Sequence, residues 1–439
     1  MPNATYVLTL GLAGCASAIA MPDITDPAPK AEPTLVRSPA ALEELLVKYD
    51  RVHGPARDAL AQQIDRMAAQ RYATVSRLFW YTDLAEAQAA AAKQDKPILA
   101  LRMLGNLDED MSCANSRFFR ATLYANGDVS TFMKDNFVLY WSSERAVPRV
   151  TIDFGDGRKI QSTTTGNSAH YILDDKGEVL DVIPGLYAPR AFRAELAKSL
   201  AHAKEVAAAP AHERGAKIIG YHEAKMNEIS AAASKLNVFA LRGMRVSAEE
   251  ALSRAQRATM SKGYVEIPQL RQITSAELRS IDDNETATWA SFAGQLWPAQ
   301  PSPARPKATT VDLGEGEQVL YYPPPGAMPQ VAAQTVFDAQ SIELVTRIYG
   351  EATEKERARM LSRLAQHALA DSALNQLRLR AEIAAYLSSG NTDFRQANDF
   401  IYAKVFHTPK SDPWLGLHSR LDFTGLPGDG VMMPATAQR

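Results

Sequence analysis

This chain has few Cys residues and almost no net charge. Its 439 residues include only two Cys, Cys15 and Cys113, and its 48 Lys and Arg nearly balance its 50 Asp and Glu. The resulting formal charge of −2 provides no field that would attract nucleic acid or an anionic membrane surface. We therefore expect no nucleic-acid partner.

The sequence motifs of several enzyme classes are missing as well. There is no Walker A loop, no Gly-x-Gly-x-x-Gly at a strand end, no Gly-x-Ser-x-Gly elbow and no Cys-x-x-Cys-His haem site. The eight His form no His-Glu-x-x-His or mixed Cys/His array. Nucleotide-binding, serine-hydrolase and c-type cytochrome functions have no support, and we expect neither a metal site nor a cofactor.

The N-terminus lacks a long hydrophobic run. Its apolar stretch at residues 6–12 is far too short for a transmembrane helix, which needs about 20 apolar residues. The stretch ends in Leu12-Ala13-Gly14-Cys15, which resembles a bacterial lipobox, although residues 1–5 hold no Lys or Arg. The resemblance implies an export signal, acylation of Cys15 and a membrane anchor that holds the protein in the cell envelope, facing the periplasm.

Two other interpretations of the N-terminus stay open. Cleavage after Ala20, at the small-x-small pattern Ala18-Ile19-Ala20, would discard Cys15 and release a soluble protein. A disordered N-terminus without a targeting role is the third interpretation. Both export routes leave Cys113 as the single thiol, so no intrachain disulfide can form. An unpaired Cys in an oxidising compartment indicates an intermolecular partner, a reactive thiol or a buried inert one.

Composition and hydrophobic period change several times along the chain. We expect a signal segment at residues 1–20, a Pro-rich tether at 21–39, a helical hairpin broken at Gly54-Pro55 at 40–75, an α/β domain at 76–205, a helical region at 206–297, a Pro-rich linker at 298–337, and a helical region with an irregular tail at 338–439. The apolar Trp414, Leu415 and Leu417 of that tail predict a clamp onto the helical region or a docking segment for a partner.

Strand and helix patterns alternate within residues 76–205. Helices are predicted at 83–93 and 113–135, and apolar strands at 97–103 and 136–141, which together make a βαβ unit with a parallel pair. Two further strands, at 169–173 and 178–183, flank the turn Asp174-Asp175-Lys176-Gly177, a strong hairpin signal, and a helix at 191–202 follows.

This order of elements carries a family resemblance. The chain resembles bacterial thioredoxin-like proteins over about 130 of its 439 residues, through Asp83-Leu84-Ala85-Glu86-Ala87, Lys96-Pro97-Ile98-Leu99, Cys113-Ala114-Asn115-Ser116, Asn136-Phe137-Val138, and Asp175-Lys176-Gly177 with Pro184-Gly185. The resemblance implies an α/β thioredoxin-like domain, with a central mixed sheet and flanking helices, joined to a mainly α-helical C-terminal region.

In that family the active-site Cys opens the helix after the first central strand, which is the position of Cys113. With Ser112 as N-cap, Cys113 would lie in the first helical turn, where backbone N–H groups and the helix dipole stabilise a thiolate. Arg117 and Arg120 add positive charge, whereas the acidic residues at 108–110 oppose it, so the net effect stays open. We favour a partly exposed functional thiol over a small buried hydrophobe.

The chain departs from the family pattern at two positions. Ser116 replaces the usual second Cys, so the Cys-x-x-Ser site can form a mixed disulfide but cannot resolve it internally. Ser168 stands where the family has a cis-proline facing the active Cys. His170 begins the next strand and could approach Cys113, although a His without catalytic role is the favoured interpretation.

We therefore predict a catalytic pair, Cys113 and Ser116, with possible neighbours at Ser112, Asn115, Arg117, Ser168 and His170. The function that follows is a monothiol redox protein of thioredoxin type, acting on exposed thiols or disulfides of envelope proteins. One alternative is a non-catalytic scaffold or partner-binding lipoprotein. Another is a one-cysteine peroxidase, in which Cys113 is oxidised to a sulfenic acid and an outside thiol restores it.

Overall fold

A computed structural model describes residues 36–164, 166–239, 283–297, 309–312, 318–321 and 331–415. The predicted signal segment with Cys15 lies outside the described residues, as does the tether up to residue 35. The same holds for residue 165, for parts of the 206–297 and 298–337 regions, and for the tail from residue 416 onward.

The described chain begins with three helices. α1 spans Pro39–Tyr49, α2 spans Pro55–Ala68 and the short α3 spans Ala73–Ser76. The break between α1 and α2 falls at Gly54, whose φ of 70° suits a residue without Cβ, and Pro55 fits the first helical turn that follows. Apolar side chains of α1 and α2 pack into a small core of their own, which includes Leu42, Leu46, Leu60, Ile64 and Met67.

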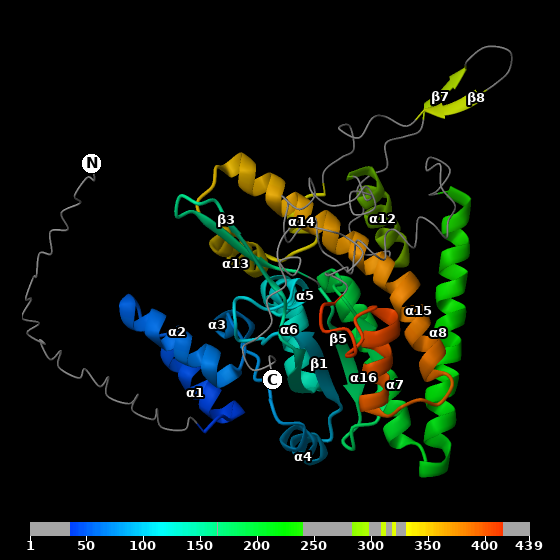
Figure 1. Ribbon diagram of the computed structural model, residues 1–439. Helices are drawn as coiled ribbons and strands as arrows, with labels where there is room; N and C mark the ends of the chain where they lie inside the picture. The colour runs from blue at the N-terminus through cyan, green and yellow to red at the C-terminus, as the bar shows by residue number, and fades with distance from the viewer. Residues whose placement is uncertain are drawn as a thin grey trace, which may run out of the picture. The chain divides into compact units, whose positions relative to one another are not determined.

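A mixed four-stranded sheet forms the centre of the fold (Figure 1). Its strands are β1 (Ile98–Leu104), β2 (Val138–Arg145), β5 (Ala169–Leu173) and β6 (Val179–Pro184), in the order β2-β1-β5-β6. β1 and β2 run parallel, and β5 is antiparallel to both β1 and β6. The predicted parallel pair and the predicted hairpin are therefore confirmed.

Helices flank this sheet, as predicted. They are α4 (Leu84–Gln94), α5 (Ala114–Phe118), which continues into the π-helical η1 (Phe119–Leu123), α6 (Gly127–Asn136) and α7 (Pro189–Ala208). The single helix predicted at 113–135 is wrong. The chain turns after Leu123, and Asn126 starts a new helix because its side chain accepts a hydrogen bond from the Val129 amide.

In a pleated strand, the side chains of consecutive residues point to opposite faces of the sheet. His170 on β5 pairs with Leu101, and its ring lies 4.9 Å from that of Phe192 on α7. The next residue, Tyr171, points to the other face, where its ring lies 5.0 Å from that of Phe394 on α16 (Phe394–Phe400). Both faces are thus covered, which explains the nearly continuous apolar runs of β1, β5 and β6.

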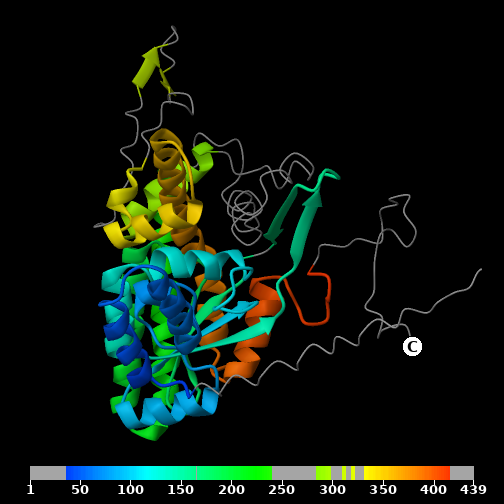
Figure 2. The ribbon, with the colours of Figure 1, turned by 90° about the vertical axis from the view of Figure 1, so that its left-hand side faces the viewer.

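A second, two-stranded sheet was missed by the sequence reasoning. β3 (Arg149–Asp153) pairs antiparallel with β4 (Lys159–Thr163) between β2 and β5 in the chain. Figure 2 shows these two strands extending away from the four-stranded sheet. Most of their residues are partly or fully exposed, so their pattern differs from that of the buried strands.

The C-terminal part is helical. Its described elements are α8 (Ala211–Phe239), α12 (Asp283–Leu296), the hairpin β7 (Thr309–Asp312) and β8 (Gln318–Tyr321), the 3₁₀ turn η3 (Ala333–Thr335), α13 (Ala339–Tyr349), α14 (Glu354–Leu374), the π-helical η4 (Asn375–Leu379), α15 (Arg380–Leu387), α16, and the π-helical η5 (Ile401–Val405). Its buried residues belong to the same hydrophobic core as those of the sheet, so the two regions fold as one unit.

Buried charges join the helical part to the sheet. Arg380 on α15 donates to the Asp181 carboxylate of β6 at 2.6 Å and to the carbonyl of Val182 at 2.6 Å. Lys225 on α8 pairs with Glu195 on α7 at 3.2 Å. Burial alone would raise the pKa of Asp181, but Arg380 and the nearby cations lower it overall.

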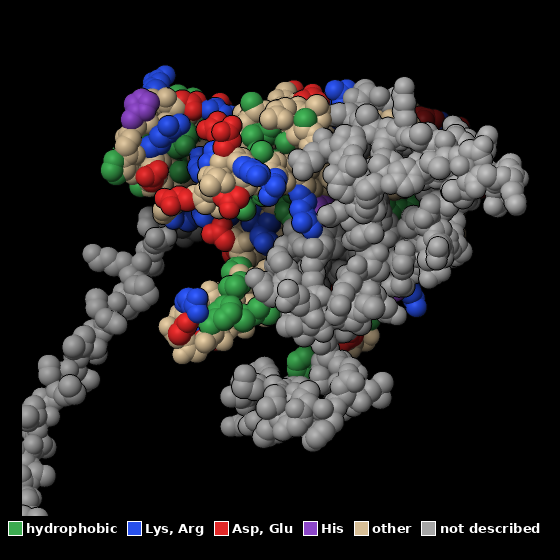
Figure 3. Space-filling model, turned by 90° about the horizontal axis from the view of Figure 1, so that it is seen from above, with side chains coloured by type: hydrophobic (Ala, Val, Ile, Leu, Met, Phe, Trp, Pro, Cys, Tyr) green, Lys and Arg blue, Asp and Glu red, His purple; other side chains and the backbone are tan. Residues whose placement is uncertain are grey.

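The exposed surface is mixed in charge. Figure 3 shows Lys and Arg interspersed with Asp and Glu over the described part of the visible face. This distribution agrees with the small net charge of −2. Within the described ranges, no helix combines the length and apolar character that crossing a membrane requires.

Candidate functional site around Cys113

Cys113 lies beyond the C-terminal end of the central strand β1. Its amide donates a hydrogen bond to the carbonyl of Leu104, the last residue of that strand, at 3.1 Å. Its backbone is extended, with φ −61° and ψ 156°, and α5 begins at the next residue. Cys113 is therefore itself the N-cap residue. The predicted N-cap, Ser112, is wrong by one position, because the chain turns into the helix one residue later than expected.

Serine hydroxyls surround the sulfur. The Cys113 Sγ lies 3.0 Å from Ser168 Oγ and donates to Ser116 Oγ at 3.4 Å. Ser116 Oγ in turn donates to Ser112 Oγ at 2.8 Å and to the Cys113 carbonyl at 2.8 Å. The structure thus brings together four of the residues predicted from sequence. Among the described residues no peptide bond is cis, and the Ser168 loop faces Cys113 with trans geometry.

The favoured expectation of a partly exposed thiol is wrong. Cys113, Ser112, Ser116 and Ser168 have no exposed surface. The position after β1 turns the thiol inward, and other parts of the chain pack over it.

Arg117 fastens the Ser112 loop to the two-stranded sheet. Its Nε donates to the Ser112 carbonyl at 3.2 Å and its Nη2 to Thr163 Oγ1 at 3.0 Å. Thr163 Oγ1 also donates to the Ser112 carbonyl, at 3.2 Å. Arg117 therefore holds the backbone next to Cys113.

The acidic residues upstream of Cys113 are largely paired. Asp110 forms an ion pair with Arg71 at 3.0 Å, and Glu109 forms one with Arg149 at 3.5 Å. The buried Arg120 donates to the backbone carbonyls of this loop, including that of Leu107 at 2.8 Å. Burial lowers the pKa of Arg120 to about 10. Asp110 and Glu109 are thus paired with arginines other than Arg120, which bonds to backbone carbonyls instead.

The hydrogen bond of the His170 ring is to Tyr124. Its Nε2 lies 2.7 Å from the Tyr124 hydroxyl, and its Nδ1 has no hydrogen-bond partner among the described residues. The ring is fully buried and packs 4.7 Å from the ring of Phe119. Burial lowers the pKa of His170 to about 3, so the imidazole is neutral near pH 7. The approach of His170 to Cys113 that the sequence allowed is therefore not among the hydrogen bonds of the described residues, and the interpretation of a His without catalytic role stays a prediction.

Asn115 is buried in the turn that follows Cys113. Its Oδ1 has no hydrogen-bond partner in the described part of the chain. The same is true of Oδ1 of Asn167, which precedes Ser168. An unsatisfied buried acceptor is unfavourable, so both amides mark places where the packing around the site is imperfect.

Sequence reasoning missed the residues that reach this site from the C-terminus. The Tyr402 hydroxyl of η5 donates to the Asn167 carbonyl at 3.4 Å, and Asn167 Nδ2 donates to Thr408 Oγ1 at 3.3 Å. Burial first, and then the neighbouring Tyr171 and Cys113 among others, raise the pKa of Tyr402 well above its ordinary value. The separation of 235 residues between Tyr402 and Asn167 left no local signal for this contact.

The tail contacts both the end of β2 and the helical region, where Lys410 pairs with Asp399 of α16 at 2.7 Å. Arg145, at the end of β2, donates to the carbonyls of Asp412 at 2.9 Å, Thr408 at 3.0 Å and Pro409 at 3.4 Å. Leu415 is buried. The prediction for Leu417 lies outside the described residues.

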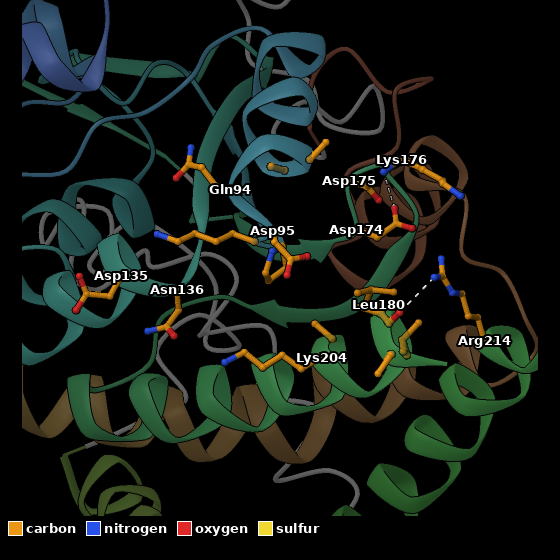
Figure 4. A pocket seen from close by; sticks show the side chains of 18 residues that line it. Gln94, Asp95, Asp135, Asn136, Asp174, Asp175, Lys176, Leu180, Lys204 and Arg214 are labelled. Atoms are coloured by element: carbon orange, nitrogen blue, oxygen red, sulfur yellow. Dashed lines mark hydrogen bonds between the residues drawn. The ribbon is translucent and has the colours of Figure 1, made fainter. Parts of the chain in front are cut away.

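A groove of about 820 Å³, shown in Figure 4, is separate from the Cys113 site. It is lined by residues that precede β1, such as Lys96 and Pro97, whereas Cys113 follows the opposite end of that strand. Cations and carboxylates line it in equal number: Lys96, Lys176, Lys204, Arg214, Asp95, Asp135, Asp174 and Asp175. None of the predicted site residues belongs to it. Across the described ranges, no group of three His, Cys, Asp or Glu could hold a metal ion.

Comparison of the chain with models of protein families, with curated proteins and with solved structures finds no match. The class that the described residues define is therefore a general one. The protein is an α/β protein with a mixed four-stranded sheet, flanking helices and a helical C-terminal part, and it carries a buried Cys at the end of its central strand.

Proposed function

We propose that the protein is a thioredoxin-like monothiol protein of the cell envelope, anchored through Cys15, whose Cys113 reacts with disulfides or thiols of partner proteins. One observation carries the proposal: the Cys113 Sγ lies 3.0 Å from Ser168 Oγ and 3.4 Å from Ser116 Oγ, at the end of the central strand. Ser168 Oγ can donate to the sulfur at that distance and so stabilise a thiolate, the reactive form of Cys, whereas Ser116 Oγ accepts from the thiol. The order of strands and helices in residues 76–205 supports the thioredoxin-like assignment.

The chemistry is thiol–disulfide exchange with an outside resolving step. The Cys113 thiolate attacks one sulfur of a partner disulfide, the partner S–S bond breaks, and a bond between Cys113 and the partner forms. The released partner thiolate takes up a proton. Ser116 cannot attack the mixed disulfide, so a second thiol, from the partner or from a small-molecule thiol, must break it and return Cys113 to the thiol form.

Mass spectrometry of a single-thiol protein tests this proposal. The full chain carrying Cys15→Ser is incubated, under native conditions, with a peptide that contains a disulfide. We expect an adduct on Cys113 that persists until dithiothreitol is added and that is absent from a Cys113→Ala variant. Ser116→Cys should replace the adduct by an intrachain disulfide, because the substituted sulfur would lie close to Cys113. A native protein that forms no adduct over hours contradicts the proposal.

A second candidate function is favoured by the complete burial of Cys113. In this alternative the protein is a non-catalytic scaffold, and the thiol is a small apolar packing group. It expects Cys113→Ala to preserve every cellular phenotype and partner capture to be insensitive to reductant. The same adduct experiment separates the two functions, since a scaffold forms no mixed disulfide in its native state.

A further inference from the structure

The C-terminal segment of residues 401–415 contacts the loop that carries Ser168. It starts as the π-helical η5 and continues as irregular chain, drawn in red beside the sheet in Figures 1 and 2. Tyr402 and Thr408 both bond to Asn167, the neighbour of Ser168. Asn167 thus links residues 401–415 to Ser168, whose Oγ lies 3.0 Å from the Cys113 sulfur. We call residues 401–415 the cover.

The contacts between the cover and the site loop are weak. The hydrogen bond from Tyr402 to Asn167 measures 3.4 Å and the one from Asn167 to Thr408 measures 3.3 Å, both at the long end of the normal range. The Oδ1 of Asn167 is buried without a partner among the described residues. Ile401, Val405 and Phe406 of the cover are buried in the core, so the part that opens is the chain after Phe406. Its opening breaks the Asn167–Thr408 hydrogen bond, and water can then satisfy the buried Asn167 acceptor.

Stronger contacts, made by residues other than those of the Cys113 site, hold the cover in its closed position. Arg145 donates to three of its backbone carbonyls. Lys410 pairs with Glu144 at 3.3 Å and with Asp399 at 2.7 Å. Glu144 also accepts from Asn398 of α16 at 2.9 Å and from Arg102 of β1. Charged groups from β1 and β2 thus hold the cover closed.

The backbone of the cover is strained at two positions. His407 and Leu415 have φ of 53° and 56°, in the left-handed region that residues with a Cβ rarely adopt. Such a conformation persists where surrounding contacts impose it. The closed form therefore depends on the hydrogen bonds of Arg145 and on the ion pairs of Lys410.

We infer that the cover is an autoinhibitory segment that blocks access to Cys113 and that opens before a partner can react with the thiol. Two features support this inference: the hydrogen bonds of Tyr402 and Thr408 to the residue before Ser168 are long, and the cover is held by a small set of charged contacts from Arg145 and Glu144 that single substitutions can remove. The inference rests on the proposed thiol function. It explains how a thiol without exposed surface can take part in exchange with another protein.

Alkylation kinetics of the full chain test the inference. In the Cys15→Ser background, Arg145→Ala removes the three hydrogen bonds to the cover, and Arg158→Ala is the matched control, since Arg158 is an exposed arginine paired with Asp156. We expect iodoacetamide to modify Cys113 about 10-fold faster or more in Arg145→Ala than in the parent, because the reaction proceeds through the open population. The control should react at the parent rate. Trypsin cleavage after Lys410 should accelerate in parallel.

Each outcome decides a different point. Faster cleavage at Lys410 with an unchanged alkylation rate would overturn the inference, because the cover would then open without freeing the thiol. An equal acceleration in Arg158→Ala would overturn it as well. Faster alkylation of Arg145→Ala, together with no adduct from a disulfide peptide, would support the cover as a gate and would refute the proposed thiol function.

Hydrogen exchange on the unmutated cover gives a second, independent measurement. The Thr408 amide donates to the Tyr402 carbonyl at 2.7 Å, and Thr408 is buried, so we expect its exchange to require that the chain after Phe406 opens. The inference expects Cys113 alkylation and Thr408 exchange to yield the same opening equilibrium in the Cys15→Ser protein. Alkylation that occurs only at the rate of global unfolding, while Thr408 exchanges much faster, rules the cover out as the gate.

Discussion

Arg380 and Asp181 form an ion pair of 2.6 Å in which each side chain is only 1% exposed. The two residues belong to different parts of the chain, one to helix α15 and the other to strand β6. Ser199 and Tyr221 also donate to the Asp181 carboxylate, at 2.6 Å and 2.9 Å. The buried carboxylate is therefore a point at which β6, α7, α8 and α15 meet.

Removing one partner of this pair should be costly. Arg380→Met leaves the Asp181 carboxylate buried without its main cation, so we expect a loss of about 3–5 kcal/mol in the free energy of unfolding. Urea denaturation followed by circular dichroism measures it. Lys217→Ala, which breaks the exposed pair with Glu205, is the control and should leave the urea midpoint nearly unchanged. A loss below about 1 kcal/mol for Arg380→Met would refute the structural importance assigned to the pair.

The buried His170 should make stability depend on pH. Because burial lowers its pKa to about 3 from 6.5, the unfolded chain binds a proton that the folded chain rejects. The stability that His170 provides is complete above pH 6.5 and is lost as the pH falls from there toward 3. We expect His170 to account for a loss of about 3 kcal/mol between pH 6.5 and pH 4.

The variant His170→Gln isolates this contribution. Glutamine retains a polar group that can reach the Tyr124 hydroxyl but does not titrate. Its unfolding free energy, measured in urea at several pH values, should fall less steeply with acidification than that of the parent. The exposed His53 supplies the control, and His53→Gln should leave the pH slope unchanged. Equal slopes for His170→Gln and the parent would contradict the prediction.

The Ser168 hydroxyl should influence the reactivity of Cys113. In the Arg145→Ala background, where access is expected to be easier, Ser168→Ala removes the hydroxyl that lies 3.0 Å from the sulfur. We expect alkylation at neutral pH to slow by about 5-fold, because a hydrogen bond of about 1 kcal/mol no longer stabilises the thiolate. Ser234→Ala, on the exposed surface of α8, serves as the control. Faster alkylation in Ser168→Ala would instead identify Ser168 as a steric block.

Acylation of Cys15 should anchor the protein to a membrane. Cys15→Ala is expected to move the protein from the membrane fraction to the soluble fraction, because its lipid attachment site is lost. Ala20→Arg disrupts the alternative cleavage pattern and should leave the anchored fraction unchanged. Fractionation with mass spectrometry of the N-terminal peptide measures both. A Cys15→Ala protein that still fractionates with membranes, with no acyl group on the parent, would show that the lipobox interpretation is wrong.

Local sequence patterns were sufficient to predict most of the central sheet. The apolar runs at 97–103 and 136–141, separated by a helical stretch, predicted β1 and β2 and their parallel pairing, because a strand–helix–strand connection returns to the same sheet. The turn at Asp174–Gly177 predicted the β5–β6 hairpin. The β3–β4 pair was missed even though Val150, Ile152 and Ile160 alternate with polar residues around Gly155 and Gly157.

The candidate site could be predicted only in part. The position of Cys113 after β1 and the presence of Ser116 three residues later follow from chain order, and so they were visible in the sequence. The N-cap was placed one residue early, because Ser112 has the better capping side chain while the backbone turns at Cys113. The contact of Ser168 with the sulfur was suggested only by resemblance, since 55 residues separate the two.

The sequence by itself determined the number of thiols, the strands of the central sheet and the absence of a resolving Cys, since these depend on residue identity and on short-range periodicity. The burial of Cys113, the bond between His170 and Tyr124 and the contact of Tyr402 with Asn167 could be seen only in the tertiary structure. These properties arise from contacts between residues up to hundreds of positions apart. Such contacts are selected by the packing of the whole core, and no local pattern encodes them.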